Sequence, residues 1–124
     1  MTLPTFDYVE PASVEEACAL LASDPEGAAV FAGGTDLLVN LRARTVGHRL
    51  LVSLRRIADL DRVDLGDRGL TISAMVTVNQ VGRHEEIARL YPGIADAARS
   101  LAAAQVRNQA TVVGNLTGTR AEIE

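Results

Sequence analysis

The sequence predicts an α+β fold built from two lobes, an α/β-like lobe over residues 1–56 and a second α+β lobe over residues 57–124. Two observations support this prediction. Short apolar runs alternate with amphipathic helical patterns through the first lobe. The second lobe opens with two strand-like runs joined by a polar turn, and helical patterns follow. A chain of 124 residues has room for one domain or for two small lobes that share a core.

The first strand and helix of the chain have clear boundaries. Residues 5–9 alternate in polarity and end just before Pro11, which predicts a short strand. Ser13 with Glu16 forms a capping-box pattern and therefore predicts the start of a helix. Apolar residues then recur at i, i+3, i+4 and i+7 on one face, namely Val14, Ala17, Cys18 and Leu21. Because Cys18 lies on this stripe, we interpret it as a small core residue and not as a nucleophile.

The rest of the first lobe follows the same alternation. Residues 24–27 read Asp-Pro-Glu-Gly, which is turn chemistry, and the apolar run 28–32 predicts a buried strand. Residues 35–43 resume a helical pattern. After an arginine-rich loop, which we interpret as solvated, residues 50–54 predict another strand and residues 57–60 a helical turn.

The second lobe begins with a predicted hairpin. Residues 63–65 and 70–75 read as strands joined by the polar turn 66–69. Thr77 with Gln80 is a second capping-box pair, and it opens a predicted helix toward Leu90. Beyond the interruption at residues 91–93, a second amphipathic helix is marked by Ile94, Ala97, Ala98, Leu101 and Ala102. Residues 110–113 predict a final short strand.

Charge and composition exclude several classes of function. The formal net charge is −4 and the sequence pI is about 5.1, whereas nucleic-acid binding relies on a concentrated basic surface, so we expect no nucleic-acid partner. No apolar run approaches the ~20 residues of a membrane helix, so we expect no membrane partner. The single cysteine excludes an intrachain disulfide. The first residues lack the features of a signal peptide, and we therefore expect a cytoplasmic protein.

Two adjacent glycines between a predicted strand and a predicted helix form the first candidate site. Glycine lets a ligand approach the backbone closely, and the start of a helix presents N–H groups and positive partial charge, so Gly33 and Gly34 indicate a phosphate-binding loop. Thr35 adds a hydroxyl donor. Asp36 is expected to cap backbone N–H groups or to accept from a ligand hydroxyl. The alternative is an ordinary capped turn, and neither a dinucleotide fingerprint nor a P-loop is present.

A second segment, residues 105–116, has a similar organisation. It reads as a polar loop, a short strand and then Gly114-Asn115, with Arg107 as a nearby cation. By itself this is equally well a strand followed by a turn. Two such loops, one in each lobe, could enclose an extended cofactor between them.

Five segments in this order resemble a known family: FDYVEPASVEEACALLA, FAGGTDLLVNLRAR, LLVSLRRI, LTISAMVTVNQV and AAAQVRNQATVVGNL. The order is similar to that of the FAD-binding medium subunit of molybdenum hydroxylases. These enzymes include aerobic carbon monoxide dehydrogenase, xanthine dehydrogenase and related molybdopterin dehydrogenases. The resemblance runs from about Phe6 to Leu116 with matching spacing.

The resemblance implies a fold, a cofactor and a set of binding residues. The fold would be the two-lobe FAD-binding fold shared with vanillyl-alcohol oxidase and with the FAD-dependent reductase of peptidoglycan precursors. FAD would be the cofactor. The family's first loop, which wraps the diphosphate, matches Ala32, Gly33, Gly34, Thr35 and Asp36, followed by Leu37. Its second loop matches Thr111, Val112, Val113, Gly114 and Asn115.

The resemblance also implies partners. In such enzymes a large subunit oxidises the substrate at a molybdenum cofactor, and a small subunit passes the electrons through two [2Fe-2S] clusters. FAD on the medium subunit then delivers them to an acceptor. Since the flavin performs the redox chemistry, we expect no catalytic side chain and no metal ligand in this chain.

The sequence departs from the family pattern at two places. Val113 stands where the family usually has a glycine. A β-branched residue there resists positive φ and puts a side chain where the backbone could meet the cofactor, so it could weaken FAD binding or be a tolerated variant. After Leu116 the family's small-residue stretch with an acidic residue is not matched. We therefore expect a truncated chain that lacks the family's C-terminal domain, with exposed sheet edges that favour self-association.

Two alternative functions follow from these departures. The chain could be a remnant or interaction module that no longer binds FAD. It could also bind another phosphate ligand through the glycine pair alone.

Overall fold

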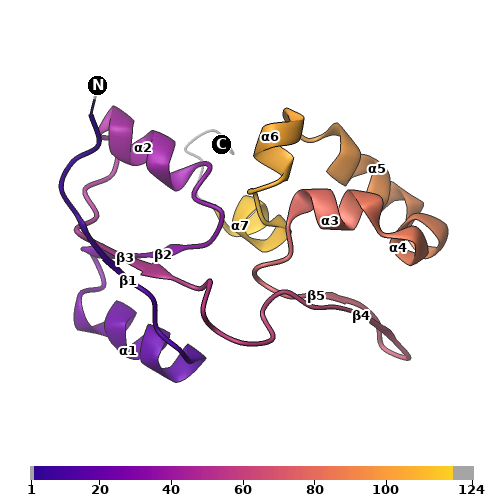
Figure 1. Cartoon of the computed structure of the whole chain (residues 1–124), viewed down its shortest axis with the longest axis horizontal. Helices are drawn as coiled ribbons and strands as arrows, with labels where there is room; N and C mark the ends of the chain where they lie inside the picture. The colour runs from indigo at the N-terminus through magenta and orange to yellow at the C-terminus, as the bar shows by residue number, and fades with distance from the viewer. Residues whose placement is uncertain (1, 119–124) are drawn as a thin grey trace. The chain divides into compact units, whose positions relative to one another are not determined.

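The computed structural model describes residues 2–118, and the chain divides into two compact units with the boundary between Leu60 and Asp61 (Figure 1). The first unit contains the strands β1 (Asp7–Val9), β2 (Ala28–Phe31) and β3 (Leu50–Ser53). It also contains the helices α1 (Val14–Ser23) and α2 (Leu37–Ala43).

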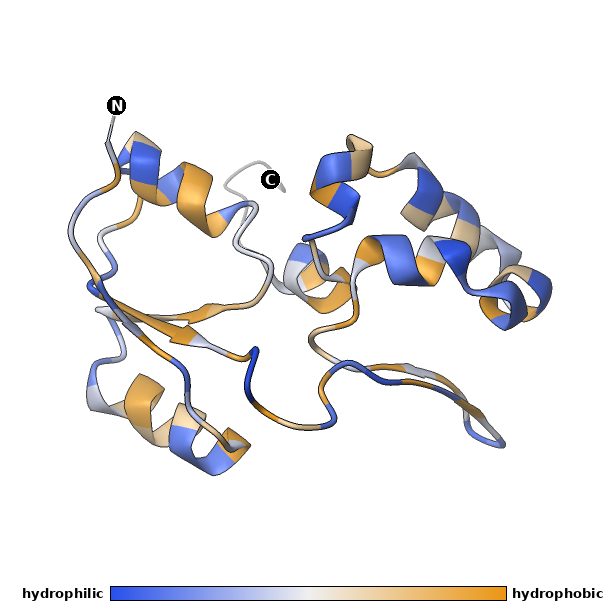
Figure 2. Cartoon of the chain, viewed as in Figure 1, coloured by the Kyte–Doolittle hydropathy of each residue, from blue (hydrophilic) through white to orange (hydrophobic). Residues whose placement is uncertain are grey.

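The three strands form a parallel sheet in the order β1-β3-β2. Leu50 on the central strand pairs with both Asp7 and Ala28, which fixes the register on each side. Leu51 and Val52 of β3 are fully buried, and Figure 2 shows hydrophobic residues along β2 and β3. Helices α1 and α2 lie on opposite faces of this sheet (Figure 1).

Helix α1 starts where its capping residue predicts, but it buries a different face. The hydroxyl of Ser13 accepts from the amide of Glu16 at 3.2 Å, whereas the carboxylate of Glu16 accepts from the amide of Ala12, one residue earlier than in a capping box. The residues that pack against the core are Ala17, Leu20 and Leu21. Cys18 is exposed, so its interpretation as a core residue is wrong. Each helical residue turns by about 100°, and Cys18 therefore leaves the narrow face centred on Ala17, Leu20 and Leu21.

The prediction of a buried strand at residues 28–32 is also wrong in part. The strand forms, but β2 lies at one side of the sheet and Val30 is 46% exposed. The central, buried position belongs to β3, because both other strands pair with it. An apolar run alone does not distinguish these two positions. The helical turn predicted over residues 57–60 is instead a series of turns in which Asp59 adopts a φ of 65°.

The second unit opens with the predicted hairpin. Strands β4 (Val63–Gly66) and β5 (Gly69–Ile72) are antiparallel, and Gly66 pairs with Gly69 across a two-residue loop. Gly69 adopts a φ of 106°, which explains a glycine at this position. The second strand ends at Ile72, three residues before the predicted end.

Five helices follow the hairpin in the described part of the unit: α3 (Val78–Arg83), α4 (Glu85–Leu90), α5 (Pro92–Ser100), α6 (Ala104–Arg107) and α7 (Val112–Thr117). The capping box of Thr77 and Gln80 at the start of α3 is complete, as predicted. The single helix predicted from there to Leu90 is wrong. His84 adopts extended backbone with a ψ of 115°, and its Nδ1 accepts from the amide of Ile87, so it ends α3 and caps α4.

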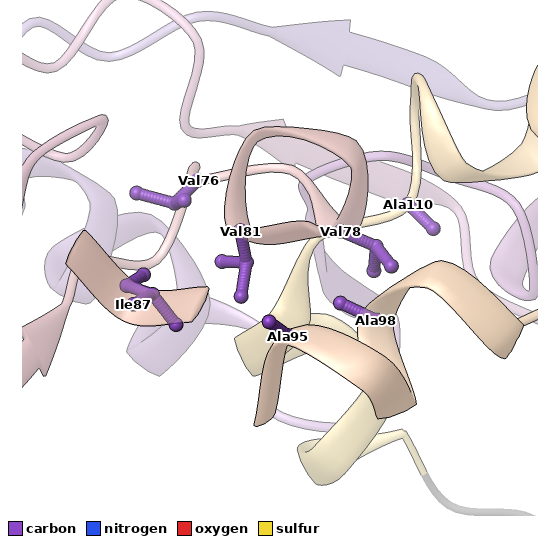
Figure 3. Close-up of a cluster of buried hydrophobic side chains, with 7 residues drawn as sticks. All are labelled: Val76, Val78, Val81, Ile87, Ala95, Ala98 and Ala110. Atoms are coloured by element: carbon purple, nitrogen blue, oxygen red, sulfur yellow. The ribbon is translucent and has the colours of Figure 1, made fainter. Parts of the chain in front are cut away.

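The core of this unit consists of small and β-branched side chains. Figure 3 shows Val76, Val78, Val81, Ile87, Ala95, Ala98 and Ala110 gathered between α3, α4 and α5. Helix α5 buries Ala95 and Ala98, whereas Ile94 is 41% exposed and Ala97 is also exposed. The predicted apolar face of this helix is therefore rotated from the observed one. Contact through alanines lets α5 approach α3 closely, which larger residues such as Ile94 would prevent.

No helix of the described residues is long and apolar enough to cross a membrane.

Candidate cofactor-binding loops

The first candidate loop connects β2 to α2, and Gly34 sets its shape. Gly34 adopts a φ of 72°, in the left-handed region that favours glycine. A Cβ built on it would lie 2.5 Å from Cε2 of Phe31, so the aromatic ring occupies the space of a side chain. The backbone oxygen of Gly34 accepts from the amide of Leu38 at 3.0 Å. Helical hydrogen bonding therefore begins at Gly34, directly after the turn.

Phe31 was not among the predicted site residues, although only Ala32 separates it from the two glycines. Its ring lies 5.9 Å from that of Tyr8 in an edge-to-face contact with an interplanar angle of 81°. This contact ties the end of β2 to β1 and holds the ring beside Gly34. The available signal in the sequence was an aromatic residue two and three positions before residues without side chains.

Asp36 stands at the N-cap position of α2 but does not cap it. Its backbone is already helical, with φ −92° and ψ −43°, and its side chain makes no capping hydrogen bond. The predicted capping role is therefore wrong, because a capping residue normally has extended backbone. Acceptance from a ligand hydroxyl stays a prediction.

The second candidate loop is the start of α7. The predicted strand over residues 110–113 is wrong, because Thr111 forms a single antiparallel bridge with Thr77 and α7 begins at the next residue. The hydroxyl of Thr111 accepts from the amide of Gly114 at 3.1 Å, which is the hydrogen bond of a helix N-cap. Thr111 is only 3% exposed. Its buried side chain therefore stabilises the loop through this hydrogen bond.

Val113 is helical, so its β-branch is not opposed by a positive φ. The residues with positive φ in the described chain are Arg44, Asp59, Ala102, Gly34 and Gly69, so Val113 is not among them. The effect of the Val113 side chain on FAD binding stays a prediction. Gly114 has a different reason for lacking a side chain: a Cβ there would lie 2.6 Å from Oγ1 of Thr111.

The backbone amides at the start of α7 differ in whether they can donate a hydrogen bond to a ligand. The amide of Val112 donates to the oxygen of Val76 at 3.2 Å, and that of Gly114 donates to the Thr111 hydroxyl. The amide of Val113 has no acceptor among the described residues, and the side chain of Asn115 is exposed. A ligand at this loop could therefore use the Val113 amide and the Asn115 side chain.

Arg107, which was predicted as a nearby cation, is partly engaged within the protein. Its Nη1 donates to the backbone oxygens of Leu101 at 3.3 Å and Ala102 at 2.7 Å. Ala102 adopts a φ of 50°, so these bonds hold an uncommon backbone turn between α5 and α6. The prediction missed α6 because Gln105 and Arg107 were interpreted as part of a polar loop.

The first loop leads directly into the first turn of α2. Gly34 turns the backbone into α2 with a positive φ, and the amides that precede Leu38 belong to the first turn of a helix, where N–H groups have no intrahelical acceptor. Residues 4–122 match the sequence family described as the FAD binding domain in molybdopterin dehydrogenase. The chain belongs to this family. The predicted family, FAD cofactor and α+β flavin-binding fold are thereby confirmed.

Relatives of this FAD-binding domain are dehydrogenase subunits. The alpha subunit of the 6-hydroxypseudooxynicotine dehydrogenase complex of Paenarthrobacter nicotinovorans is 33% identical over 124 residues, which are 100% of this chain and 42% of that protein. The xanthine dehydrogenase FAD-binding subunit of Escherichia coli O157:H7 is 34% identical over 110 residues, which are 88% of this chain and 37% of that protein. The chain therefore spans about two fifths of the length of these relatives.

Solved structures of the same family share the fold. The Cu,Mo-CO dehydrogenase matches with a TM-score of 0.89 and 32% identity over 93% of this chain and 40% of the compared chain. Quinoline 2-oxidoreductase from Pseudomonas putida 86 matches with a TM-score of 0.88 and 34% identity over 94% of this chain and 40% of the compared chain.

Proposed function

We propose that this domain binds FAD, that residues 32–37 hold the diphosphate, and that residues 111–115 form a second FAD-binding loop. The observation that carries the proposal is the left-handed Gly34 at the start of α2, in a chain whose family binds FAD. In the first loop, Gly33 gives close access to the backbone, Gly34 allows the positive φ of the turn, and Thr35 offers a hydroxyl. In the second, the Val113 amide and the Asn115 side chain are the available donors.

The roles of the remaining predicted residues follow from their surroundings. Thr111 positions the second loop through its hydrogen bond to Gly114, and it is too buried to offer a large contact to a ligand. Asp36 is the acceptor for a ligand hydroxyl. Ala32, Leu37 and Val112 contribute backbone groups to the two loops. The proposed first flavin lobe covers residues 1–56 and the second begins at residue 57, four residues before the boundary between the two compact units.

In this proposal the chain is the FAD-binding part of a molybdenum hydroxylase. Several relatives are named as a subunit of a complex or as a medium chain, which supports assembly with other subunits. A large molybdopterin subunit and a small [2Fe-2S] subunit are the proposed partners. Bound FAD supplies the electron-transfer chemistry, while the protein binds and orients it.

The test is a titration in which the protein is added to FAD and binding is measured as quenching of the flavin fluorescence. Gly34→Ala places a Cβ against the ring of Phe31 and strains a backbone with positive φ, so we expect at least tenfold weaker FAD binding. Gly47→Ala is the matched control, because a Cβ at Gly47 meets nothing within 4 Å. Equal FAD affinity in both variants would refute the assignment of the first loop.

The alternative function is an interaction module without FAD. The wild-type chain distinguishes it directly, because a folded chain that leaves flavin fluorescence unchanged at saturating concentration has no flavin site. Far-UV circular dichroism of the same sample establishes that the chain is folded.

A further inference from the structure

A basic pocket lies within the second unit, apart from the residues of the two flavin loops. Its volume is about 350 Å³, and its lining includes Asn79, Gly82, Arg83, Arg99, Arg107 and Asn108. These residues come from α3, α5, α6 and the position after α6, and α3 is in contact with both α5 and α6. Figure 2 shows hydrophilic segments on all three helices.

Arg99 is held in the pocket wall by α3. Its Nε donates to the backbone oxygen of Gly82 at 2.7 Å, and its Nη1 lies 3.5 Å from the carboxylate of Asp96. A Cβ on Gly82 would lie 3.2 Å from Cγ of Arg99, so the missing side chain makes room for the arginine stem. The guanidinium group is thus fixed by one strong bond and keeps its Nη2 available.

Arg107 is fixed in a comparable way. Only its Nη1 donates to backbone oxygens, those of Leu101 and Ala102. The other two nitrogens of the guanidinium group have no acceptor among the described residues. Arg99 and Arg107 are therefore held in place and still have guanidinium N–H groups available. Less side-chain entropy is lost when a ligand binds to arginines that are already ordered.

Arg83 is the third cation, and its side chain has no hydrogen bond or ion pair among the described residues. It is the last residue of α3 and is exposed. An arginine without an internal partner at the edge of a pocket is free to close on a ligand.

The pocket has an unbalanced charge. No carboxylate lines it, and Asp96, which lies beside Arg99, has a side chain that is 74% exposed. Three guanidinium groups share this pocket in a chain whose formal net charge is −4. Arginine matches phosphate with two parallel donors, and Asn79 and Asn108 add amide donors to the wall.

We propose that this pocket binds the phosphate or diphosphate group of a small molecule. Its volume lies near the lower end of the range for small-molecule sites, about 300–1,000 Å³, so it fits a phosphorylated fragment. None of its lining residues belongs to residues 32–37 or 111–115, so the site is additional to the proposed FAD site.

The experiment is a calorimetric titration of the full chain with pyrophosphate at low ionic strength, in the presence of saturating FAD. We expect saturable binding of one pyrophosphate to each chain. Arg83→Gln should weaken it about tenfold, the loss expected for one hydrogen bond to a charged group. Arg89→Gln is the matched control, since Arg89 is an exposed arginine of α4 that does not line the pocket. Each variant removes one positive charge from the same unit.

Four results would overturn the proposal. One is the lack of saturable binding, and another is equal weakening in both variants, which indicates general attraction. A third is displacement of pyrophosphate by excess FAD, which assigns the pocket to the flavin. The last is equally tight binding of malonate, which excludes phosphate as the preferred ligand. If the chain does not take up FAD, the same comparison of Arg83→Gln with Arg89→Gln is made without it, so the two proposals fail independently.

Discussion

Gly34 and Val113 show how one residue decides the role of a loop. The left-handed backbone at Gly34 requires glycine, whereas the helical backbone at Val113 accepts any residue that tolerates a helix. The sequence comparison suggested the opposite concern, that Val113 disrupts the second loop. The reason for the error is that a missing glycine was equated with a missing positive φ.

Val113→Gly tests this difference. We expect no gain in FAD affinity and a loss of about 1 kcal/mol in the free energy of unfolding, because glycine is unfavourable inside a helix. Val113→Ala is the control, since alanine keeps the helix and removes only the branched side chain. Urea denaturation and FAD titration of both variants give the two quantities. Tighter FAD binding by Val113→Gly alone would show that the valine is a defect after all.

The ion pair between Asp24 and Arg49 makes the stability of the folded chain depend on pH. The hydrogen bond from Arg49 at 2.8 Å, and then that from the amide of Gly27 at 3.0 Å, lower the pKa of Asp24 below its ordinary value. A lowered folded-state pKa adds stability that is fully present above the unfolded pKa, about 3.9, and is lost as the pH falls through the folded pKa.

We therefore expect Asp24→Asn to flatten the loss of stability below about pH 4. The measurement is the free energy of unfolding in urea at pH 5 and at pH 3. Asp67→Asn, in the exposed loop between β4 and β5, serves as the control. An unchanged pH dependence in Asp24→Asn would mean that other carboxylates cause the acid sensitivity.

At the scale of elements, the sequence predicted where helices begin better than where they end or which of their faces are buried. The hydroxyl caps at Ser13 and Thr77 gave the first residues of α1 and α3 because this chemistry is local. The hairpin followed from its two glycines for the same reason. Buried faces depend on neighbouring elements, and for that reason Cys18 was interpreted as a core residue and residues 28–32 as a buried strand.

The segment from Thr111 shows why local patterns can mislead. Thr-Val-Val is β-branched and predicts a strand, yet the same threonine is a good N-cap. Its backbone makes one bridge to Thr77 and then enters α7. The bridging partner lies 34 residues earlier in the chain (111 − 77), so no local window of sequence contains it.

The cap of α7 should be essential to the second loop. We expect Thr111→Ala to lower the free energy of unfolding by about 1–2 kcal/mol, because the Gly114 amide loses its acceptor in a buried setting. Thr111→Ser keeps the hydroxyl and should retain most of the stability. Thermal unfolding of the two variants makes the comparison. Equal losses in both would point to packing of the methyl group in place of the cap.

At the scale of the whole molecule, the family and the cofactor were predictable from the sequence, whereas the support of each loop was not. The order of five segments was sufficient for the family. The ring of Phe31 beside Gly34 and the buried hydroxyl of Thr111 required coordinates, because both depend on side-chain packing.

Binding through both loops predicts a pattern of hydrogen exchange. We expect added FAD to slow amide exchange in residues 32–38 and in residues 112–115, because ligand binding stabilises the state that closes around it. The β4–β5 hairpin contains no proposed FAD contact and should exchange at the same rate as before. Protection of the first segment alone would remove the second loop from the proposal.

The strand order of the first unit also has a consequence for synthesis on the ribosome. Among the described strands, β1 and β2 pair only with β3, although both precede it in the chain. Neither can complete a hydrogen-bonded ladder of this sheet until Leu50–Ser53 has been made. At roughly 5–20 residues per second, β1 waits several seconds for its partner. During that interval the nascent chain has apolar strands without a sheet, so this early segment is where a chaperone would be most useful.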